Sequence, residues 1–440
     1  NDTAQLDYLR EEVREAVIGQ ILDVARRFSV IRFDAAMVLA RRHIQRLWYP
    51  LPGHEAGIPS RSMAAVPADE VRRLMPQEFW REVVDRVAAE VPDTLLLAEA
   101  FWLMEGYFVR TLGMHRVYNS AFMHMLRDEK NAKYQQVIRE TVSFDHRILG
   151  RYVNFMNNPD ERSAIDQFGS HDKYFGVATL LATLPGLPMF GHGQIEGYSE
   201  QYGMEFRRAQ RDEWPDEGLI DRHRREICPL LHERWRFAGS SGFRQLTALE
   251  GDGAVHDVFA YANRAERGPA NAWERRSLVV YLNRYPRCHV RIAGVAEALG
   301  LGHDPDGYVI LYDQRTGLDY LRQVRDLREH GLELSLDGYA CHVFLGFTEV
   351  SDADGAGWAE LAQRVGLRGI PDAHVALRRS RDEPVRDAVS AVFATRVAEE
   401  AFLPAAGADT DTQSGADAAR ATFTAALERL ASLADGAGDT

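Results

Sequence analysis

The chain has 440 residues, of which 45% are hydrophobic and 27% are charged, so it can build more than one sizeable core. Its formal net charge of −13, without a cluster of lysine and arginine, argues against nucleic acid and anionic membranes as partners. The sequence also lacks the run of roughly eighteen apolar residues that a transmembrane helix needs. Three widely spaced cysteines, Cys228, Cys288 and Cys341, predict buried free thiols in a cytoplasmic protein, with one disulfide left as an alternative.

The first predicted strand ends in an acid. A helix is expected over Leu9–Phe28 and a strand over Val30–Asp34. Because side chains two apart share a face of a strand, Val30, Arg32 and Asp34 should point the same way. An arginine beside an aspartate favours the ionised carboxylate. Asp34 therefore suits the role of a nucleophile.

A second acid, Glu99, ends the apolar run Leu95–Glu99. Before it we expect a helical stretch through Trp48, a long loop rich in Pro and Gly, and a helix over Pro76–Glu90. No cation lies close to Glu99 in sequence, and Phe101 and Trp102 follow it. Apolar surroundings raise the pKa of a carboxyl group, which is what a general acid needs.

The third acid, Asp160, follows a strand expected near Arg151–Met156. Strands are also expected at His115–Asn119 and Leu187–Gly191, with helices over Asp172–Leu184 and Leu219–Phe237. A single acid at a strand end is usually a turn or capping residue, but three in a βα pattern predict a catalytic set. In a (β/α)8 barrel such a set lies at the carboxyl ends of the strands.

These motifs carry a family resemblance. Val30-Ile-Arg-Phe-Asp34 resembles the strand-four nucleophile motif of the α-amylase family, glycoside hydrolase family 13, and Ala98-Glu99-Ala-Phe-Trp102 is similar to its strand-five acid/base motif. Phe155-Met-Asn-Asn-Pro-Asp160 resembles the strand-seven motif, and Leu184–Gly197 the strand-eight segment. The resemblance covers about residues 1–350. It implies a partial (β/α)8 TIM barrel with strands four to eight present.

The resemblance also implies a function. We expect a retaining α-glycosidase that acts on α-glucans or small α-glucosides by double displacement. Asp34 would be the nucleophile, Glu99 the acid/base and Asp160 the stabiliser of the transition state. The expected substrate-binding residues are Arg32, Trp102, Asn158, His171 and His192. No cofactor and no metal ligand set is predicted, although a calcium site built from loops would leave no spacing signal; the oligomeric state stays open.

Two departures keep other functions open. Pro159 replaces the family's strand-seven histidine, as in the similar maltosyltransferases that use maltose 1-phosphate, so α-glucan glycosyl transfer is an alternative. The family's strand-three motif is not found upstream of Asp34, so we expect the chain to begin inside the barrel. An inactive fragment or a non-catalytic sugar-binding relative is therefore a further alternative.

The pattern of predicted secondary structure changes after about residue 240. Short alternating strands over residues 241–350 predict an antiparallel β-sandwich, which the resemblance also implies. Residues 351–440 predict a helical tail in which the tract Ala405–Ala418 is disordered. The expected domains are thus the C-terminal part of a TIM barrel (residues 1–240), the β-sandwich (241–350) and the tail (351–440).

Overall fold

The computed structural model describes residues 5–54, 63–101, 104–201, 207–265, 275–302, 304–352, 355–393 and 420–432. The chain divides into two compact units. The first comprises Asn1–Gly300 and His330–Leu345, and the second comprises Leu301–Glu329 and Gly346–Thr440. The finer division into a barrel part, a sandwich and a tail at residues 240 and 350 stays a prediction.

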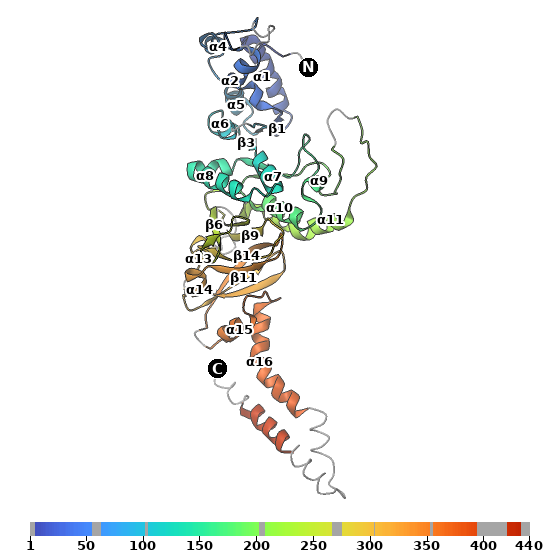
Figure 1. The fold of residues 1–440 in the computed structure, drawn as a ribbon, viewed down its shortest axis with the longest axis vertical. Helices are drawn as coiled ribbons and strands as arrows, with labels where there is room; N and C mark the ends of the chain where they lie inside the picture. The colour runs from blue at the N-terminus through green and yellow to red at the C-terminus, as the bar shows by residue number, and fades with distance from the viewer. Residues whose placement is uncertain are drawn as a thin grey trace. The chain divides into compact units, whose positions relative to one another are not determined.

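The first unit begins with a five-stranded parallel sheet, shown with its helices in the blue to green part of Figure 1. Its strands pair in the order of the sequence and are β1 (Val30–Phe33), β2 (Leu95–Ala98), β3 (Arg116–Tyr118), β4 (Tyr152–Phe155) and β5 (Leu187–Met189). Each overlaps one of the five strands predicted from the sequence. The parallel sheet of a partial barrel is thus confirmed.

Helices alternate with these strands. They are α1 (Glu11–Ala25), η1 (Ala36–Leu39), α2 (Arg41–Trp48), α4 (Ala68–Leu74), α5 (Phe79–Glu90), α6 (Glu105–Arg110), α7 (Ser120–Arg127), α8 (Asn131–Leu149), α9 (Ala164–Phe168) and α10 (Asp172–Thr183). The single helix predicted over Leu219–Phe237 is instead a series of short turns: α11 (Glu217–Arg222), the π-helical η2 (His223–Ile227), α12 (Cys228–His232) and η3 (Arg234–Arg236). Pro229, near the start of α12, lacks the N–H that an unbroken α-helix would use there.

The parallel sheet separates two hydrophobic cores. Leu96 and Val117 belong to a core with α1, α2, α5 and α6, whereas Leu97 and Tyr118 belong to another with α7, α8 and α10. Neighbouring residues of one strand therefore face opposite cores, as the period of two predicts.

The remainder of the first unit is antiparallel. Its strands are β6 (Arg244–Glu250), β7 (Gly253–Ala254), β8 (Val258–Arg264), β9 (Arg276–Leu282), β10 (Cys288–Ala293), β13 (Leu332–Leu336) and the start of β14 (Cys341–Val350), with the helix α13 (Val295–Leu299). They pair in the order β14-β9-β8-β6-β10-β13, and β7 pairs with β6. The antiparallel β-rich region is confirmed, while its arrangement as a sandwich stays a prediction.

The second unit holds the hairpin β11 (Tyr308–Asp313) and β12 (Leu318–Gln323), the helices α14 (Val324–Glu329), α15 (Trp358–Val365) and α16 (Ala373–Val392), and a helical segment at 420–432. Its core packs Trp358 and Leu361 of α15 against Tyr308, Ile310 and Leu321 of the hairpin. The tract Ala405–Ala418 lies outside the described residues.

Two further expectations can be compared with the structure. Cys288 and Cys341 are buried and Cys228 is half-buried, and none of the three forms a disulfide. Among the described residues, no helix combines the length and hydropathy that a membrane span requires.

Candidate functional site

Asp34 and Arg32 meet at the carboxyl end of β1. The Arg32 Nη1 atom lies 2.7 Å from Oδ1 of Asp34, as expected for residues two apart on one face of a strand. Directly after Asp34 the backbone turns sharply, because Ala35 adopts a left-handed conformation with φ 43°. Non-glycine residues seldom adopt this conformation, and it is enriched at functional sites. The turn leaves the Asp34 side chain 59% exposed.

Glu99 stands beside Asp34 because β1 and β2 are parallel and in register. Phe33 pairs with Ala98, so the next residue of each strand, Asp34 and Glu99, ends its strand at the same level. Glu99 is only 3% exposed. Its Oε2 accepts a hydrogen bond from the Ala35 amide at 2.9 Å and lies 3.1 Å from Nη2 of Arg32. One guanidinium group therefore contacts both carboxylates.

The environments of the two acids differ. Burial raises the pKa of Glu99, and the neighbouring Asp34 carboxyl raises it further, while the Ala35 amide and the Arg32 charge act in the opposite direction. Asp34, by contrast, is largely open to water. Glu99 is thus the carboxyl group of the pair that favours holding a proton. No cation is close to Glu99 in sequence, but Arg32 reaches it in space from the adjacent strand.

Asp160 joins the pair from the turn that follows β4. The Asn158 Oδ1 atom accepts hydrogen bonds from the amides of Asp160 and Glu161, at 2.9 and 3.0 Å, which fixes this turn. Asn158 itself is buried. One carboxylate oxygen from each of Asp34, Glu99 and Asp160 lies within 4.8 Å of the others. The structure therefore brings together the three acids that the sequence singles out.

Tyr118 secures Arg32 from the next strand. Its hydroxyl accepts a 2.8 Å hydrogen bond from Nε of Arg32, and the guanidinium lies 5.3 Å from the centre of its ring. The ring is 1% exposed and packs against Phe155 with centroids 4.9 Å apart. Tyr118 is thus a buried support for Arg32. The sequence offers no signal for this contact beyond the position of Tyr118 at a strand end.

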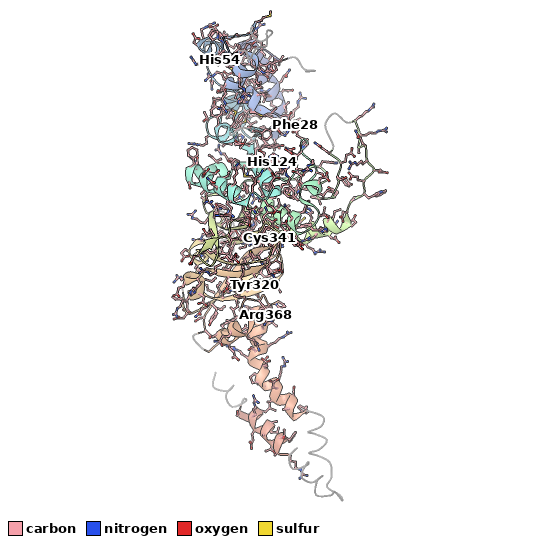
Figure 2. All side chains as sticks on the ribbon, viewed as in Figure 1. Phe28, His54, His124, Tyr320, Cys341 and Arg368 are labelled. Carbon is pink, nitrogen blue, oxygen red and sulfur yellow. The ribbon has the colours of Figure 1, made fainter. Side chains whose placement is uncertain are left out.

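A small cavity of about 60 Å³ lies beside the turn that carries Asp160. It is lined by Asn157, Asn158, Pro159, Glu161, Ser163, His192, Glu200 and Gln201. Amide, carboxylate, hydroxyl and imidazole groups of this kind form hydrogen bonds with hydroxyl-rich ligands. His124 of α7, labelled in Figure 2, lies 3.2 Å from Glu161 through its Nε2 atom. The sequence did not single out His124, Glu161, Glu200 or Gln201, because the segments that carry them meet only in the folded chain.

The loop after β5 needs a glycine and a buried support. An added Cβ at Gly191 would overlap the end of the Asn157 side chain, so glycine lets this loop lie close to the segment that follows β4. Behind the loop, the Tyr174 hydroxyl donates to the Gln194 carbonyl at 2.7 Å and lies 2.9 Å from Nε2 of His223. His223 belongs to the π-helical turn η2, a feature found often near functional sites.

The remaining predicted substrate-binding residues are His171, His192 and Trp102, and the structure places them differently. His192 is exposed and lines the cavity, with its ring 6.1 Å from that of Tyr198. His171 is exposed at the start of α10, and in the described part of the chain its side chain makes no hydrogen bond or ion pair. Trp102 lies outside the described residues. The sugar-binding roles of all three stay predictions.

Three carboxylates that lie close together are also potential ligands of a metal ion. Within the described ranges they are the one group of three or more potential ligands whose atoms lie close enough to share an ion, and carboxylate oxygens suit Ca²⁺ or Mg²⁺. However, Arg32 already contacts Asp34 and Glu99, and its charge would repel a cation placed between them. The donor set therefore fits proton transfer better than metal binding.

Comparisons with known proteins find similarity in the fold. No protein-family model matches the sequence, and no curated protein matches it significantly. An α-amylase from H. orenii superposes with a TM-score of 0.50 at 17% identity, over 78% of this chain and 66% of that structure. The native Nostoc punctiforme debranching enzyme gives 0.50 at 14% identity, over 77% of this chain and 62% of its own. The chain spans less than two thirds of either structure.

Proposed function

We propose that this chain carries the catalytic site of a retaining α-glycosidase that acts on α-glucans or α-glucosides. The observation that carries the proposal is the convergence of Asp34, Glu99 and Asp160 within 4.8 Å at the carboxyl ends of parallel strands. The resemblance of this chain's fold to that of an α-amylase and of a debranching enzyme supports α-glucans or α-glucosides as the substrate class.

In the proposed reaction, an Asp34 oxygen attacks the anomeric carbon while the bond to the leaving oxygen breaks. Glu99 donates its proton to that oxygen, so the leaving group departs as an alcohol. Water then attacks the anomeric carbon as Glu99 removes its proton, and the ester bond to Asp34 breaks. Two inversions at one carbon give net retention.

The spacing of the acids supports this course. Retaining glycosidases place their two carboxyl groups about 5–5.5 Å apart, whereas inverting enzymes need about 6.5–9.5 Å to admit a water molecule. One carboxylate oxygen of Asp34 lies within 4.8 Å of one of Glu99, which is shorter than the separation that inverting enzymes need. Asp160 would stabilise the positive charge that develops on the sugar ring, and Arg32 would hold both carboxylates in place.

Glycosyl transfer is the second candidate, and Pro159 favours it. This residue stands in the wall of the cavity beside Asp160, where the α-amylase family has a histidine. In transfer, a sugar hydroxyl takes the place of water in the second step. The site chemistry is otherwise the same, so only the products distinguish the two functions.

The experiment is to incubate the 440-residue chain with an aryl α-glucoside and with maltooligosaccharides. We expect turnover, with the α-anomer as the first product by NMR; longer oligosaccharides among the products would mark transfer. Asp34→Asn should lose turnover by at least about 10⁴-fold, whereas the control Asp23→Asn, on the exposed face of α1, should not. A folded wild-type chain that binds maltooligosaccharides without turnover would instead identify a non-catalytic sugar-binding protein.

A further inference from the structure

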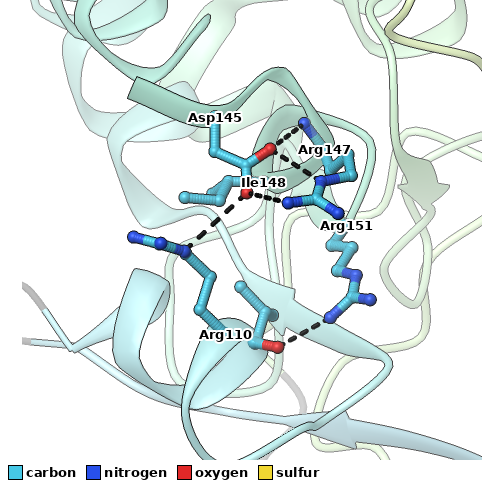
Figure 3. Close-up of a pocket in the computed structure, with 6 residues that line it drawn as sticks. Arg110, Asp145, Arg147, Ile148 and Arg151 are labelled. Carbon is cyan, nitrogen blue, oxygen red and sulfur yellow. Dashed lines mark hydrogen bonds and ion pairs between the residues drawn. The ribbon is translucent and has the colours of Figure 1, made fainter. Parts of the chain in front are cut away.

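A second polar cavity lies in the first unit, apart from the three acids. It has a volume of about 260 Å³ and is lined by Val109, Arg110, Asp145, Arg147, Ile148 and Arg151 (Figure 3). These residues come from the end of α6, the last turns of α8 and the residue before β4. From this arrangement we propose that the cavity binds a small phosphate monoester. This inference does not depend on the proposed function.

The position of the cavity follows from the topology. Parallel strands begin at one edge of the sheet and end at the other, and Arg151 directly precedes β4 while Asp160 lies beyond its end. Arg151 also lies at the start of the strand pair β3–β4, where its carbonyl accepts from the Val117 amide at 3.2 Å. The arginine cavity is therefore at the opposite edge of the sheet from the proposed catalytic acids.

The backbone of α8 places the Asp145 carboxylate among the arginines of this cavity. Helix α8 is interrupted at Asp145, whose backbone is extended with φ −163° and ψ 103°. Its Oδ1 atom accepts hydrogen bonds from the amide and the Nε of Arg147, each at 3.0 Å, and Nη2 of Arg147 lies 3.1 Å from Oδ2. The Arg110 Nε lies 3.7 Å from the same carboxylate. These contacts lower the pKa of Asp145 to about 2, with the Arg147 hydrogen bond as the largest cause.

The positive charge of the cavity is not balanced. Three arginines line it, and Asp145 is the one carboxylate among the described residues of its lining. Arg151 donates to the Val109 carbonyl at 2.6 Å and, within the described residues, has no acidic partner. Arg151 is half-buried, whereas Arg110 and Arg147 are exposed. A partly desolvated cation without an acidic partner favours an anionic ligand.

Neighbouring groups strengthen the positive potential. Arg116, at the start of β3, donates to the His115 carbonyl at 3.1 Å, and among the residues that the structure describes its buried Nε finds no hydrogen-bond partner. Burial lowers the pKa of Arg116, and the charge of Arg151 lowers it further. Burial lowers the pKa of His115, with added effects from Arg151 and Arg116, so this imidazole is mainly neutral near pH 7 and the added charge comes from Arg116. The region stands out in a chain whose net charge is −13.

The chemistry and size of the cavity select the ligand class. Guanidinium groups offer paired N–H donors that match the oxygens of phosphate, and the excess of two positive charges equals the charge of a phosphate monoester dianion. Cavities for drug-sized ligands measure roughly 300–1,000 Å³. At about 260 Å³ this cavity suits a small metabolite that carries one phosphate group.

Stabilisation of a helix end is a simpler role for two of these arginines. Arg110 and Arg147 stand in the last turns of α6 and α8, where cations interact favourably with the helix dipole. That role predicts effects on stability alone. It requires neither a cavity nor the half-buried, acid-free position of Arg151. The two roles can therefore be separated by measuring binding.

The experiment is calorimetric titration of the 440-residue chain with a hexose 6-phosphate, inorganic phosphate and the unphosphorylated hexose. We expect the hexose phosphate to bind most tightly, inorganic phosphate to compete with it, and the neutral hexose to have no effect on it. Arg151→Gln and Arg147→Gln should each weaken binding at least about tenfold, because each removes charge-assisted hydrogen bonds. Arg139→Gln removes an exposed arginine from the same helix and should leave binding unchanged.

Arg147 is the safer of the two variants, because its side chain is 75% exposed and its loss should not prevent folding. Thermal unfolding adds a second readout, since a ligand that binds the native state raises the Tm. The proposal is overturned if the folded wild-type chain binds neither phosphate probe at millimolar concentration. Equal affinity in wild type, Arg151→Gln and Arg147→Gln would overturn it as well, and would point to binding elsewhere on the chain.

Discussion

The Nη2 atom of Arg32 lies 3.1 Å from Oε2 of Glu99 on the neighbouring strand. The same guanidinium contacts Asp34 at 2.7 Å. This bridge brings a cation to a buried carboxyl group whose pKa is raised, so it opposes the effect of burial. The proton affinity of Glu99 should therefore depend on Arg32.

Replacement of Arg32 tests this dependence. Arg32→Gln should lower kcat/KM by about 10²–10³-fold, because a charged group that orients both acids is lost. The guanidinium lowers the pKa of Glu99, so its removal should raise that pKa and move the alkaline limb of the pH–rate profile to higher pH. The measurement is kcat/KM against pH for wild type, Arg32→Gln and Arg26→Gln. Arg26 pairs with Glu90 on the surface and serves as the control. An alkaline limb that stays in place would contradict the link between Arg32 and Glu99.

Glu99 should act as the acid. Glu99→Gln should slow maltooligosaccharides by about 10²–10⁴-fold, because their leaving alcohols need a proton. Aryl α-glucosides with good leaving groups should be slowed far less in the first step. The alkaline limb of the profile should also disappear, since it reports deprotonation of this group. Glu105→Gln is a matched control, because Glu105 is likewise a carboxyl group whose pKa is raised by burial. Equal losses on both kinds of substrate would contradict the assigned role.

How far the sequence predicts the site is clear from these residues. The pairing of Arg32 with Asp34 follows from the period of two within one strand. The contacts of Arg32 with Glu99 and Tyr118 depend on the register between strands, in which Arg32 pairs with Leu97. Sequence periodicity contains no information on that register, so the bridge appears only in the structure.

The same limit applies to the fold. The apolar strands β1, β2 and β4 stand out in the sequence, whereas β10, Cys288-His-Val-Arg-Ile-Ala293, alternates buried and exposed residues and includes an arginine. Strands β6, β12 and β13 also mix charged and apolar residues, and none of the four was predicted. Their pairing with neighbours outweighs their weak intrinsic preference.

Gly176 should be essential for packing. It lies on α10, and a Cβ added there would overlap the ring of Tyr281 on β9. Both residues are buried, and the Tyr281 hydroxyl donates to the Lys173 carbonyl at 3.4 Å. Gly176→Ala should therefore lower the free energy of unfolding by about 1–3 kcal/mol, as overpacking does. Urea denaturation provides the measurement, with Gly19→Ala on the exposed face of α1 as the control, because its added methyl meets nothing within 4 Å. Equal stability of Gly176→Ala and wild type would show that α10 and β9 are less closely packed.

His223 should make stability depend on pH. It is 2% exposed, and burial lowers its pKa to about 4 from 6.5, with a smaller opposing effect from Glu196. Below pH 6.5 the unfolded chain takes up a proton that the folded chain does not, so stability falls as pH falls toward 4. The loss between pH 7 and pH 5 should be about 2 kcal/mol.

His223→Phe isolates this effect from the other titrating groups. Phenylalanine fits beside Phe175 and Phe190, whose rings already surround His223. The variant should lose less stability than wild type between pH 7 and pH 5, by the same amount of about 2 kcal/mol. Denaturant titrations at both pH values give the comparison. Parallel losses in the two proteins would mean that His223 titrates normally in the folded state.

The most direct test of the central proposal is to trap the covalent intermediate. A fluorinated α-glucosyl fluoride, which forms such an intermediate faster than it is hydrolysed, should label the chain with one glycosyl group. Peptide mass spectrometry should find that group on Asp34, and Asp34→Asn should remain unlabelled while Asp23→Asn is labelled like wild type. A folded, active chain that hydrolyses α-glucosides with the label on another residue, or with no label, would contradict the assignment of Asp34 as the nucleophile.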